Sequence, residues 1–586
     1  MTDILPKTSL RRSLCVAALC AICLTIFLPA IASAHAILLR STPKKDDILH
    51  SSPAIVQMWF SEELNASLST VEVLNAEHQQ VDNKDAHINP NDNKELDITL
   101  KENLPPDVYV VVWRSDSADD GHVLLGSFLF TIANPNGDIP QLTPGNNPAQ
   151  GVLGGGDSTS AGDIDATSIF NMIAVTLSEI CAIFWMGAQL WLNFVLQTVA
   201  EKQPDEQRLN GQIEARFEKR FSLPVLGLLF LANLGVLYGQ VLTLTNGNWG
   251  AAFSASLLVG QATSGRFGTY WLARMGVIIL AGGVGVALLL SKKRSSLVRS
   301  ISPLLNLFLG ALLFIAMTMS GHAAAVNAVF LPYSVIIDWL HLLAAALWVG
   351  GMIYILLIYL PVLRRRAFLE RARSLLTLLP VYSPLAIAGV VIMAITGPLN
   401  ATFHLTDISQ FFTTSYGRAL LIKSLLVAAL LATSAYHVFL LRPRLKKEYQ
   451  KYAYAKGRME KAQSHDDLSP ADEESRQQAG ESQPVINKLL ARQTKLREER
   501  LVQRTSSLTR VLSWEPWLGV AVLICVGLMN IFAGTLVPAT TVTQPPQSGT
   551  TTPVAAVFNG TAKTSDGHYS VTLHITPNRL GTNVFA

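Results

Sequence analysis

The feature that most constrains this chain is a series of about eight apolar stretches between residues 168 and 537. Each reaches the length of about 20 residues that an α-helix needs to cross a bilayer. Charged residues make up only 15% of the chain, against about 25% in typical soluble proteins. The pattern predicts an all-α polytopic domain, embedded in a lipid bilayer, over residues 166–538. The predicted spans are 168–199, 222–244, 267–291, 300–320, 334–361, 376–401, 417–441 and 515–537.

The loops between these stretches differ in basic charge. Four of them are rich in Lys and Arg, whereas the intervening loops 245–265, 321–333 and 402–415 contain neither. Under the positive-inside rule the basic loops are cytoplasmic. This predicts a multi-pass protein of the plasma (inner) membrane with both its N-terminal and C-terminal domains on the extracytoplasmic side. The basic loops are 200–220, 292–299, 364–373 and 442–513.

Residues 1–34 have the pattern of a secretory signal peptide. A basic segment precedes an apolar run, which ends in the small residues Ala32-Ser33-Ala34. A first membrane anchor is the alternative interpretation. Cleavage after this triplet makes His35 the first residue of the mature protein, and its α-amine and imidazole can then chelate one metal ion together.

Residues 35–133 carry the pattern of an exported all-β sandwich with an immunoglobulin-like fold. Short β-branched runs are separated by clusters of Pro, Asn and Asp. Residues 35–165 contain 7 Lys and Arg against 20 Asp and Glu. This acidic balance argues against nucleic acid as a partner and is compatible with cations. The expected strands are Ile55–Phe60, Ser69–Leu74, Leu96–Leu100, Val108–Trp113 and Val123–Ile132.

Linkers and a C-terminal segment complete the predicted organisation. A Pro-, Gly- and Asn-rich linker spans 134–165, and a Thr- and Pro-rich linker spans 539–553. Residues 554–586 contain a strand-like run, Tyr569–Ile575, and we expect them to begin a second external β domain that is left incomplete. The charged stretch 445–513 is predicted to be a cytoplasmic loop, part helical and part disordered.

The strongest local signal for metal binding is Asp120-Gly121-His122, directly before an expected strand. Residues two apart at a strand edge point to the same face. A carboxylate oxygen and an imidazole nitrogen there can complete a square-planar site with the amine and imidazole of His35, and tetragonal N,O coordination suits Cu(II). The alternative is an ordinary Asp-Gly turn with a solvated His122. The five cysteines form no disulfide framework or CxxC metal site.

Several motifs in residues 35–132 occur together. They are His35-Ala36 with Leu38, Ser41 and Pro43, then Val56–Ser61, then Asp120-Gly121-His122 with Gly126, Phe128 and Phe130. This set resembles the CopC family of exported copper-binding β-sandwiches. The resemblance implies a Cu(II) site formed by His35, Asp120 and His122. Some members also have a Met-rich Cu(I) site, but this domain contains only Met58, so no such site is expected here.

A second set of motifs lies in the predicted membrane domain. It comprises Ser320–Ala324, Asp338–His341 with Trp348–Gly351, and Tyr416–Arg418 with Lys423. Together they resemble the CopD family. A CopC domain fused to a CopD domain implies capture of copper outside and its transfer across the membrane. The tail Tyr569–Phe585 resembles the beginning of a YtkA-like domain.

Ionisable residues within membrane spans are costly and usually functional. Asp338 and His341 are three apart and share one face of a helix. A carboxylate that accepts a hydrogen bond from His341 can orient the imidazole for a metal ion. Glu179, in the first span, lies along the same candidate copper pathway. Helix capping and helix-to-helix contact are the alternative roles for these groups.

Soft ligands lie near the external end of the fourth span. His322 is at that end, and Met317 and Met319 lie just inside it. Thioether and imidazole ligands together are compatible with Cu(I). These residues are therefore candidates for Cu(I) binding in the membrane domain, with plain packing as the alternative for the methionines.

The leading hypothesis is a copper-binding and copper-transport protein that imports copper and contributes to copper homeostasis or resistance. It is not expected to be an enzyme, and no P-loop or other nucleotide-binding motif occurs. One alternative is a copper-dependent redox enzyme that uses His35 as a histidine brace. Another is a haem-binding electron carrier with His341 and either His437 or His322 as axial ligands.

Overall fold

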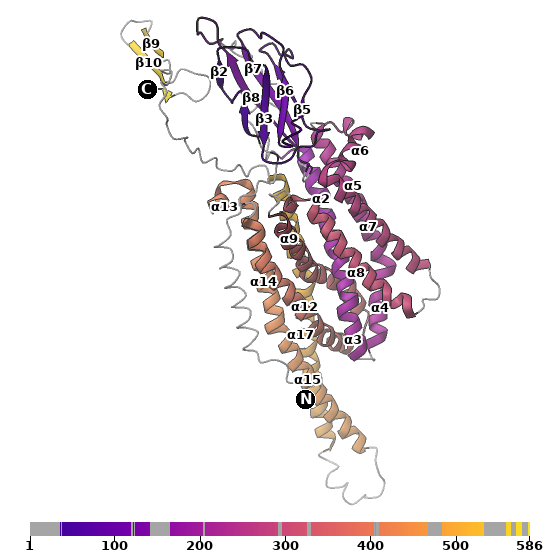
Figure 1. Ribbon diagram of the computed structural model, residues 1–586. Coiled ribbons are helices and arrows are strands. Elements are labelled where there is room, and N and C mark those ends of the chain that lie inside the picture. Colours follow the sequence, from indigo (N-terminus) through magenta and orange to yellow (C-terminus); the bar gives the residue numbers. More distant parts are fainter. Residues whose placement is uncertain are drawn as a thin grey trace, which may run out of the picture. The chain divides into compact units, whose positions relative to one another are not determined.

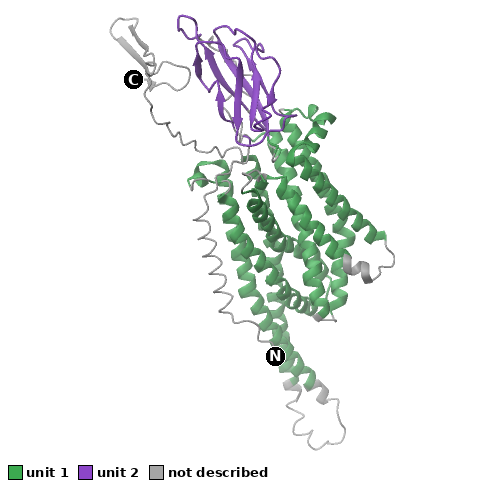
Figure 2. Ribbon diagram, viewed as in Figure 1, with its two compact units in different colours: residues 1–35, 117–122, 161–536 green, residues 36–116, 123–160, 537–586 purple. Residues whose placement is uncertain are grey.

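The computed structural model of the chain contains two compact units, which Figure 2 shows in different colours. One comprises residues 36–116, 123–160 and 537–586, and the other comprises residues 1–35, 117–122 and 161–536. The structure describes residues 36, 38–118, 121, 123–140, 164–202, 206–245, 247–290, 296–324, 330–402, 405, 409–466, 483–532, 558–563, 570–576 and 584–585.

A sandwich of two four-stranded sheets forms the N-terminal part of the chain (Figure 1). The strand orders are β1-β3-β6-β5 and β2-β8-β7-β4, and all neighbours are antiparallel except β2 and β8. The predicted all-β fold is confirmed, with β1, β2 and β5 as additional short strands. The strands are β1 (Leu38–Thr42), β2 (Asp47–Leu49), β3 (Ile55–Phe60), β4 (Thr70–Leu74), β5 (His87–Ile88), β6 (Glu95–Thr99), β7 (Val108–Asp116) and β8 (Val123–Ile132).

The core of the sandwich follows from the period-two alternation of its strands. In β3, Val56, Met58 and Phe60 are buried and the residues between them are half-buried. The ring of Trp113 lies over Gly126, its cross-strand partner, so closely that a Cβ at Gly126 would lie 2.3 Å from the ring. Since Met58 is fully buried in this core, its thioether packs against apolar neighbours.

The second unit is a bundle of helices (Figure 1). Eight of its described helices are long and apolar enough to cross a membrane, and they correspond in order to the eight predicted spans. The predicted fold class, a β-sandwich followed by an all-α membrane domain, is confirmed. The helical elements are α2 (Ala166–Leu190), η1 (Trp191–Leu196), α3 (Gln197–Lys202), α4 (Gln207–Phe217), η3 (Glu218–Ser222), α5 (Leu223–Leu244), η4 (Ala251–Phe253), α6 (Ala255–Thr263), α7 (Gly265–Leu290), α8 (Ser296–Met319), η5 (His322–Ala324), α9 (Leu331–Ala345), η6 (Ala346–Gly350), α10 (Gly351–Tyr354), η7 (Ile355–Tyr359), α11 (Leu360–Leu363), α12 (Phe368–Thr402), α13 (Gln410–Thr413), α14 (Ser415–Tyr436), η8 (His437–Leu441), α15 (Arg442–Asp466) and α17 (Gln483–Phe532).

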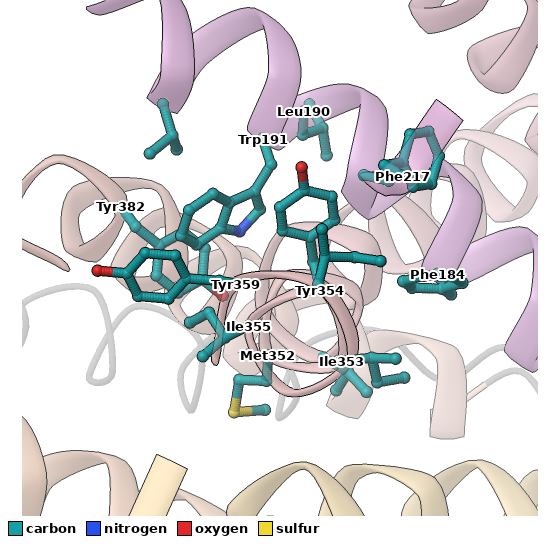
Figure 3. Packing of buried hydrophobic residues seen from close by; sticks show 14 of the residues in the cluster. Phe184, Leu190, Trp191, Phe217, Met352, Ile353, Tyr354, Ile355, Tyr359 and Tyr382 are labelled. Carbon is teal, nitrogen blue, oxygen red and sulfur yellow. The ribbon is translucent and has the colours of Figure 1, made fainter. Parts of the chain in front are cut away.

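Large aromatic side chains fill the bundle near its π-helical segments (Figure 3). The ring of Trp191 stacks on Tyr354 with centroids 5.1 Å apart and lies 4.9 Å from the ring of Tyr382. Nearby, α2 and η6 approach closely because glycines face each other. A Cβ at Gly187 would lie 2.6 Å from the backbone of Gly350. The first and fifth spans are thereby held in direct contact.

The charged stretch expected to be a partly disordered loop, 445–513, contains two long helices. Leu445 of α15 and Leu501 and Leu508 of α17 are buried in the bundle core, and Arg497 lies 3.5 Å from Glu448 of α15. These two helices account for the helical part of the prediction, because leucines at helical spacing bury an apolar stripe despite the high charge. Residues 467–482 lie outside the described residues.

A small sheet near the C-terminus has the strand order β11-β10-β9. Strand β10 coincides with the predicted strand-like run and pairs with β9 in antiparallel register. The strands are β9 (Phe558–Lys563), β10 (Ser570–Thr576) and β11 (Val584–Phe585).

Two neighbouring acidic residues of β6 make the stability of the sandwich dependent on pH. Burial raises the pKa of Asp97 and that of Glu95, and both side chains are at least nine-tenths buried. A carboxyl whose pKa is higher in the folded state than in the unfolded state binds more protons when folded. Its contribution to stability is therefore lost as pH rises from its unfolded pKa of about 4 through the raised folded value.

We expect Asp97→Asn to raise the melting temperature of residues 35–140, made alone, at pH 7, and we expect this gain to shrink as pH falls towards about 4. The amide keeps the shape of the side chain and removes the buried charge. Melting followed by circular dichroism across this pH range measures the effect. Glu63→Gln, at an exposed position, is the control and should change little. A gain from Asp97→Asn that is independent of pH would contradict the assignment.

Candidate metal sites

Asp338 and His341 lie one turn apart on α9, as predicted, and both contact neighbouring helices. The Asp338 carboxylate accepts hydrogen bonds from the Thr318 hydroxyl of α8 and from the Asn400 amide of α12, each at 3.1 Å. His341 does not take Asp338 as its orienting partner. Its Nδ1 lies 2.8 Å from the Thr396 hydroxyl of α12. The expected hydrogen bond between Asp338 and His341 is therefore replaced by two separate hydrogen bonds to α12, one from each side chain.

The hydrogen bonds of Thr396 decide which nitrogen of His341 carries the proton. The Thr396 hydroxyl donates its one hydrogen to the carbonyl of Ile392 at 2.9 Å. It must then accept from His341, which assigns the proton to Nδ1. The other ring nitrogen, Nε2, keeps its lone pair and has no hydrogen-bonding partner among the described residues. This is the state in which an imidazole binds a metal ion.

Lys423 of α14 brings a positive charge into the same region. It interacts electrostatically with Glu179 of α2 and with Asp338, and also with the thiol of Cys525 of α17. Glu179 in turn interacts with Asp338, and its Oε2 is buried without a hydrogen-bonding partner in the part of the chain that the structure describes. Two carboxylates, one imidazole and one ammonium group thus form a polar cluster in the interior of the bundle.

Several residues that belong to this cluster or hydrogen-bond to it were not selected from the sequence. Thr318, Thr396 and Asn400 carry no charge and belong to no metal motif, so nothing local distinguishes them from other polar residues in membrane helices. Lys423 was noted only as part of the CopD resemblance. A basic residue near the middle of an apolar span is itself a signal, and it could have been used to add Lys423 to the candidates.

The soft ligands expected near the fourth span are only partly described. Met317 and Met319 flank Thr318 near the end of α8 and are half-buried, and Met317 packs against the main core. His322 begins the short helix η5, but its side chain lies outside the described part. Among the described residues, no group of three or more His, Cys, Asp or Glu side chains is arranged to hold one metal ion.

The predicted outer site lies outside the described residues, since these do not include His35, Asp120 or His122. Its sequence neighbours Ala36 and Gly121 are described. Ala36 is fully buried, and its carbonyl accepts a hydrogen bond from the Ser115 hydroxyl at 2.8 Å. Ser115 is the second-last residue of β7.

The backbone between β7 and β8 forms a tight turn. Asp116 and Val123 are the last pair of the ladder between the two strands. The amide of Gly121 donates to the carbonyl of Ser117 at 2.9 Å. Gly121 has φ +72°, a conformation that glycine adopts without strain. Gly121, which stands between Asp120 and His122 in the sequence, therefore lies within the six-residue connection 117–122.

His437 has a different environment from His341. Its Nδ1 lies 2.9 Å from Oε2 of Glu515 on α17, and the Ser434 hydroxyl donates to the other oxygen of Glu515. Glu515 is completely buried. The pair joins the seventh and eighth spans, which accounts for His437 without a haem ligand role.

Two family models match the chain. The model described as CopC domain matches residues 38–133. The model described as Copper resistance protein D, CopD, matches residues 376–466. One chain therefore carries both a CopC domain and a CopD match. The CopD match includes Thr396, Asn400 and Lys423 of the polar cluster.

One similar protein aligns with most of the chain, and two solved structures each align with less than a fifth of it. The chain is 26% identical over 423 residues to the copper transport protein CutJ of Bacillus subtilis (strain 168), covering 71% of this chain and 70% of that protein. The crystal structure of CopC from Methylosinus trichosporium OB3b is 25% identical and covers 18% of this chain and 97% of its own, with a TM-score of 0.16. The methionine-rich copper resistance protein PcoC from Escherichia coli is 31% identical and covers 17% and 98%, with a TM-score of 0.15.

We expect Glu515→Leu to lower the free energy of unfolding of the full chain in micelles by about 3 kcal/mol, because it leaves His437 and Ser434 buried without their partner. Titration with a denaturing detergent, followed by circular dichroism, measures the loss. Glu499→Leu, at an exposed position of the same helix, is the control. Equal stability of the two variants would show that the pair contributes nothing.

Proposed function

We propose that this chain captures copper outside the membrane with its sandwich and imports it through the helical unit, and so contributes to copper homeostasis or resistance. The observation that carries the proposal is the fixed His341 imidazole of α9, whose Nε2 lone pair is available one helical turn from Asp338. The CopC and CopD matches and the similarity to a copper transport protein support copper as the transported ion.

The outer site is proposed to hold Cu(II) with His35, Asp120 and His122. The bond from Ser115 to Ala36 supports this assignment, because it ties the residue after His35 to the end of β7. The Asp120–His122 connection starts just beyond that end. An amine, imidazole nitrogens and one carboxylate oxygen suit the tetragonal geometry of Cu(II).

The membrane pathway is proposed to run past His322, Met317 and Met319 to the cluster of Asp338, His341 and Glu179. The soft sulfur donors favour Cu(I). Conversion of Cu(II) to Cu(I) takes one electron per ion from an external reductant, so transport is to be assayed with and without ascorbate.

Lys423 is proposed to offset one of the two carboxylate charges when no copper is present. A buried carboxylate pair without a counter-charge is unfavourable in a bilayer. An incoming copper ion then competes with the ammonium group for Glu179 and Asp338. This competition would keep binding weak enough for the ion to move on.

The import direction and the membrane orientation rest on the loop charges. The basic loops are proposed to face the cytoplasm, which puts the sandwich and the C-terminal strands outside. Copper captured there has only the inward path through the bundle. Uptake into proteoliposomes, compared with efflux from loaded ones, tests the direction.

For the outer site, we expect residues 35–140 with a native His35 N-terminus to give a nitrogen-rich, tetragonal Cu(II) EPR signal. Addition of one residue before His35 should abolish this signal, because the α-amine is moved out of reach. His50→Ala, at an exposed position, is the control and should leave the signal unchanged. Equal binding by the native and extended forms would contradict the assignment of His35.

For the membrane site, we expect Thr396→Val to lower copper uptake by proteoliposomes about 10–100-fold, because the Nδ1–H of His341 loses its acceptor and the imidazole its orientation. Thr396→Ser keeps the hydroxyl and should retain most of the uptake. Valine is nearly isosteric with threonine, whereas serine lacks its methyl group, so a general packing defect would affect Thr396→Ser at least as strongly as Thr396→Val. Full copper uptake by the Thr396→Val variant would contradict the assignment of His341 to the copper pathway.

A further inference from the structure

Helix α2 with its continuation η1 packs against helix α8 (Figure 1). Several polar side chains follow one another along this contact. On α2 and η1, Trp185, Gln189 and Asn193 follow one another at intervals of four residues. Asn193 Nδ2 donates to the Gln189 carbonyl at 2.8 Å and to the carbonyl of Pro303 on α8 at 3.0 Å. These three residues therefore lie on a stripe that faces α8.

The facing stripe of α8 contains Asn306. Its neighbours on the same face, Pro303 and Gly310, both touch the first span. Pro303 accepts from Asn193 as above, and a Cβ at Gly310 would lie 2.5 Å from the sulfur of Met186 and 3.4 Å from the ring of Trp185. Positions 303, 306 and 310 share one side of a helix, so Asn306 faces the same contact. We call these four side chains, Trp185, Gln189, Asn193 and Asn306, the polar seam.

The polar seam is deeply buried, and several of its donor and acceptor atoms have no hydrogen-bonding partner among the described residues. Trp185 and Gln189 are each 1% exposed, and Asn193 and Asn306 are each 7% exposed. Among the described residues, no partner exists for five of their atoms: Trp185 Nε1, Gln189 Oε1, Gln189 Nε2, Asn193 Oδ1 and Asn306 Oδ1. Each such group is unfavourable when left without a partner in an apolar interior.

The chemistry of these five atoms identifies the ligand class. Trp185 Nε1 and Gln189 Nε2 are donors, whereas the three amide oxygens are acceptors. A metal ion would satisfy only the acceptors, and an anion would satisfy only the donors. Water both donates and accepts, and buried water typically makes about three hydrogen bonds to groups of this kind.

We propose that the polar seam binds a file of water molecules in the half of the bundle that adjoins the basic loops. The seam lies between α3 at the end of the first span and the start of α8. It would give protons or partly hydrated ions a polar path through an otherwise apolar region. The inference rests on hydrogen bonding alone and holds whichever ion the protein transports, so its failure leaves the proposed copper transport untouched.

Radiolytic footprinting tests the proposal, because bound water next to a side chain yields hydroxyl radicals that oxidise it in place. The experiment uses the full chain in lipid nanodiscs, and mass spectrometry locates the oxidised residues. Trp271 is a matched reference: it is also buried, at 6% exposure, but its Nε1 donates to the carbonyl of Asn233 at 2.9 Å. We expect Trp185 to be oxidised faster than Trp271 although it is less exposed to solvent.

The double variant Gln189→Leu with Asn306→Leu should reduce oxidation of Trp185 to the level of Trp271. Thr176→Val is the control, because it removes another buried polar group of α2, on the face that packs against Gly527, and should leave Trp185 oxidation unchanged. Oxidation of Trp185 no faster than that of Trp271 in the native chain would overturn the proposal, and this comparison needs no variant to fold. Oxidation of Trp185 that persists in the double variant would also overturn it.

Discussion

The absence of water inside the bilayer is the constraint on which the helical unit depends. A polar side chain there must find its partner on another helix or in water held inside the bundle, since lipid offers none. Asp338 is held by residues of α8 and α12, and His341 by a residue of α12. These bonds position the groups of the proposed copper pathway and also tie together the helices that carry them. The same need for partners thus serves both the packing of the bundle and the chemistry of the site.

Charge balance sets the limits within which such a site can work. Glu179 and Asp338 without Lys423 would place two negative charges in an apolar region. Lys423 offsets one of these two charges, and a cation that enters must compete with an interaction already present. A pathway that bound copper with no such competition would hold the ion rather than pass it on. The ammonium group of Lys423 is therefore as much a part of the proposed pathway as the ligands.

In the proposed outer site the sandwich has a different task, which is to position the α-amine of His35 at the start of the proposed mature chain. A terminus is ordinarily free to move, and an α-amine on a mobile end is a weak ligand. Here Ala36 lies in the core and is bonded to Ser115 of β7. The α-amine of His35 is then only one residue away from the anchored Ala36. The aromatic core of Trp113 and its neighbours provides the rigid support for that anchor.

Periodicity in the sequence determined much of this protein by itself. Runs of about 20 apolar residues determine membrane spans, alternation determined the main strands, and a spacing of three put Asp338 and His341 on one helix face. These are local rules, read over a few turns or one strand. Only the tertiary structure decided that Thr396, 55 residues further along, holds His341, or that Lys423 meets Glu179. It likewise decided that the charged stretch forms α15 and α17 and that the polar seam has unmet donors and acceptors. The physical reason is that partners in a folded chain come from elements far apart in sequence, and residues such as Thr396 and Asn306 acquire their roles only from what packs against them.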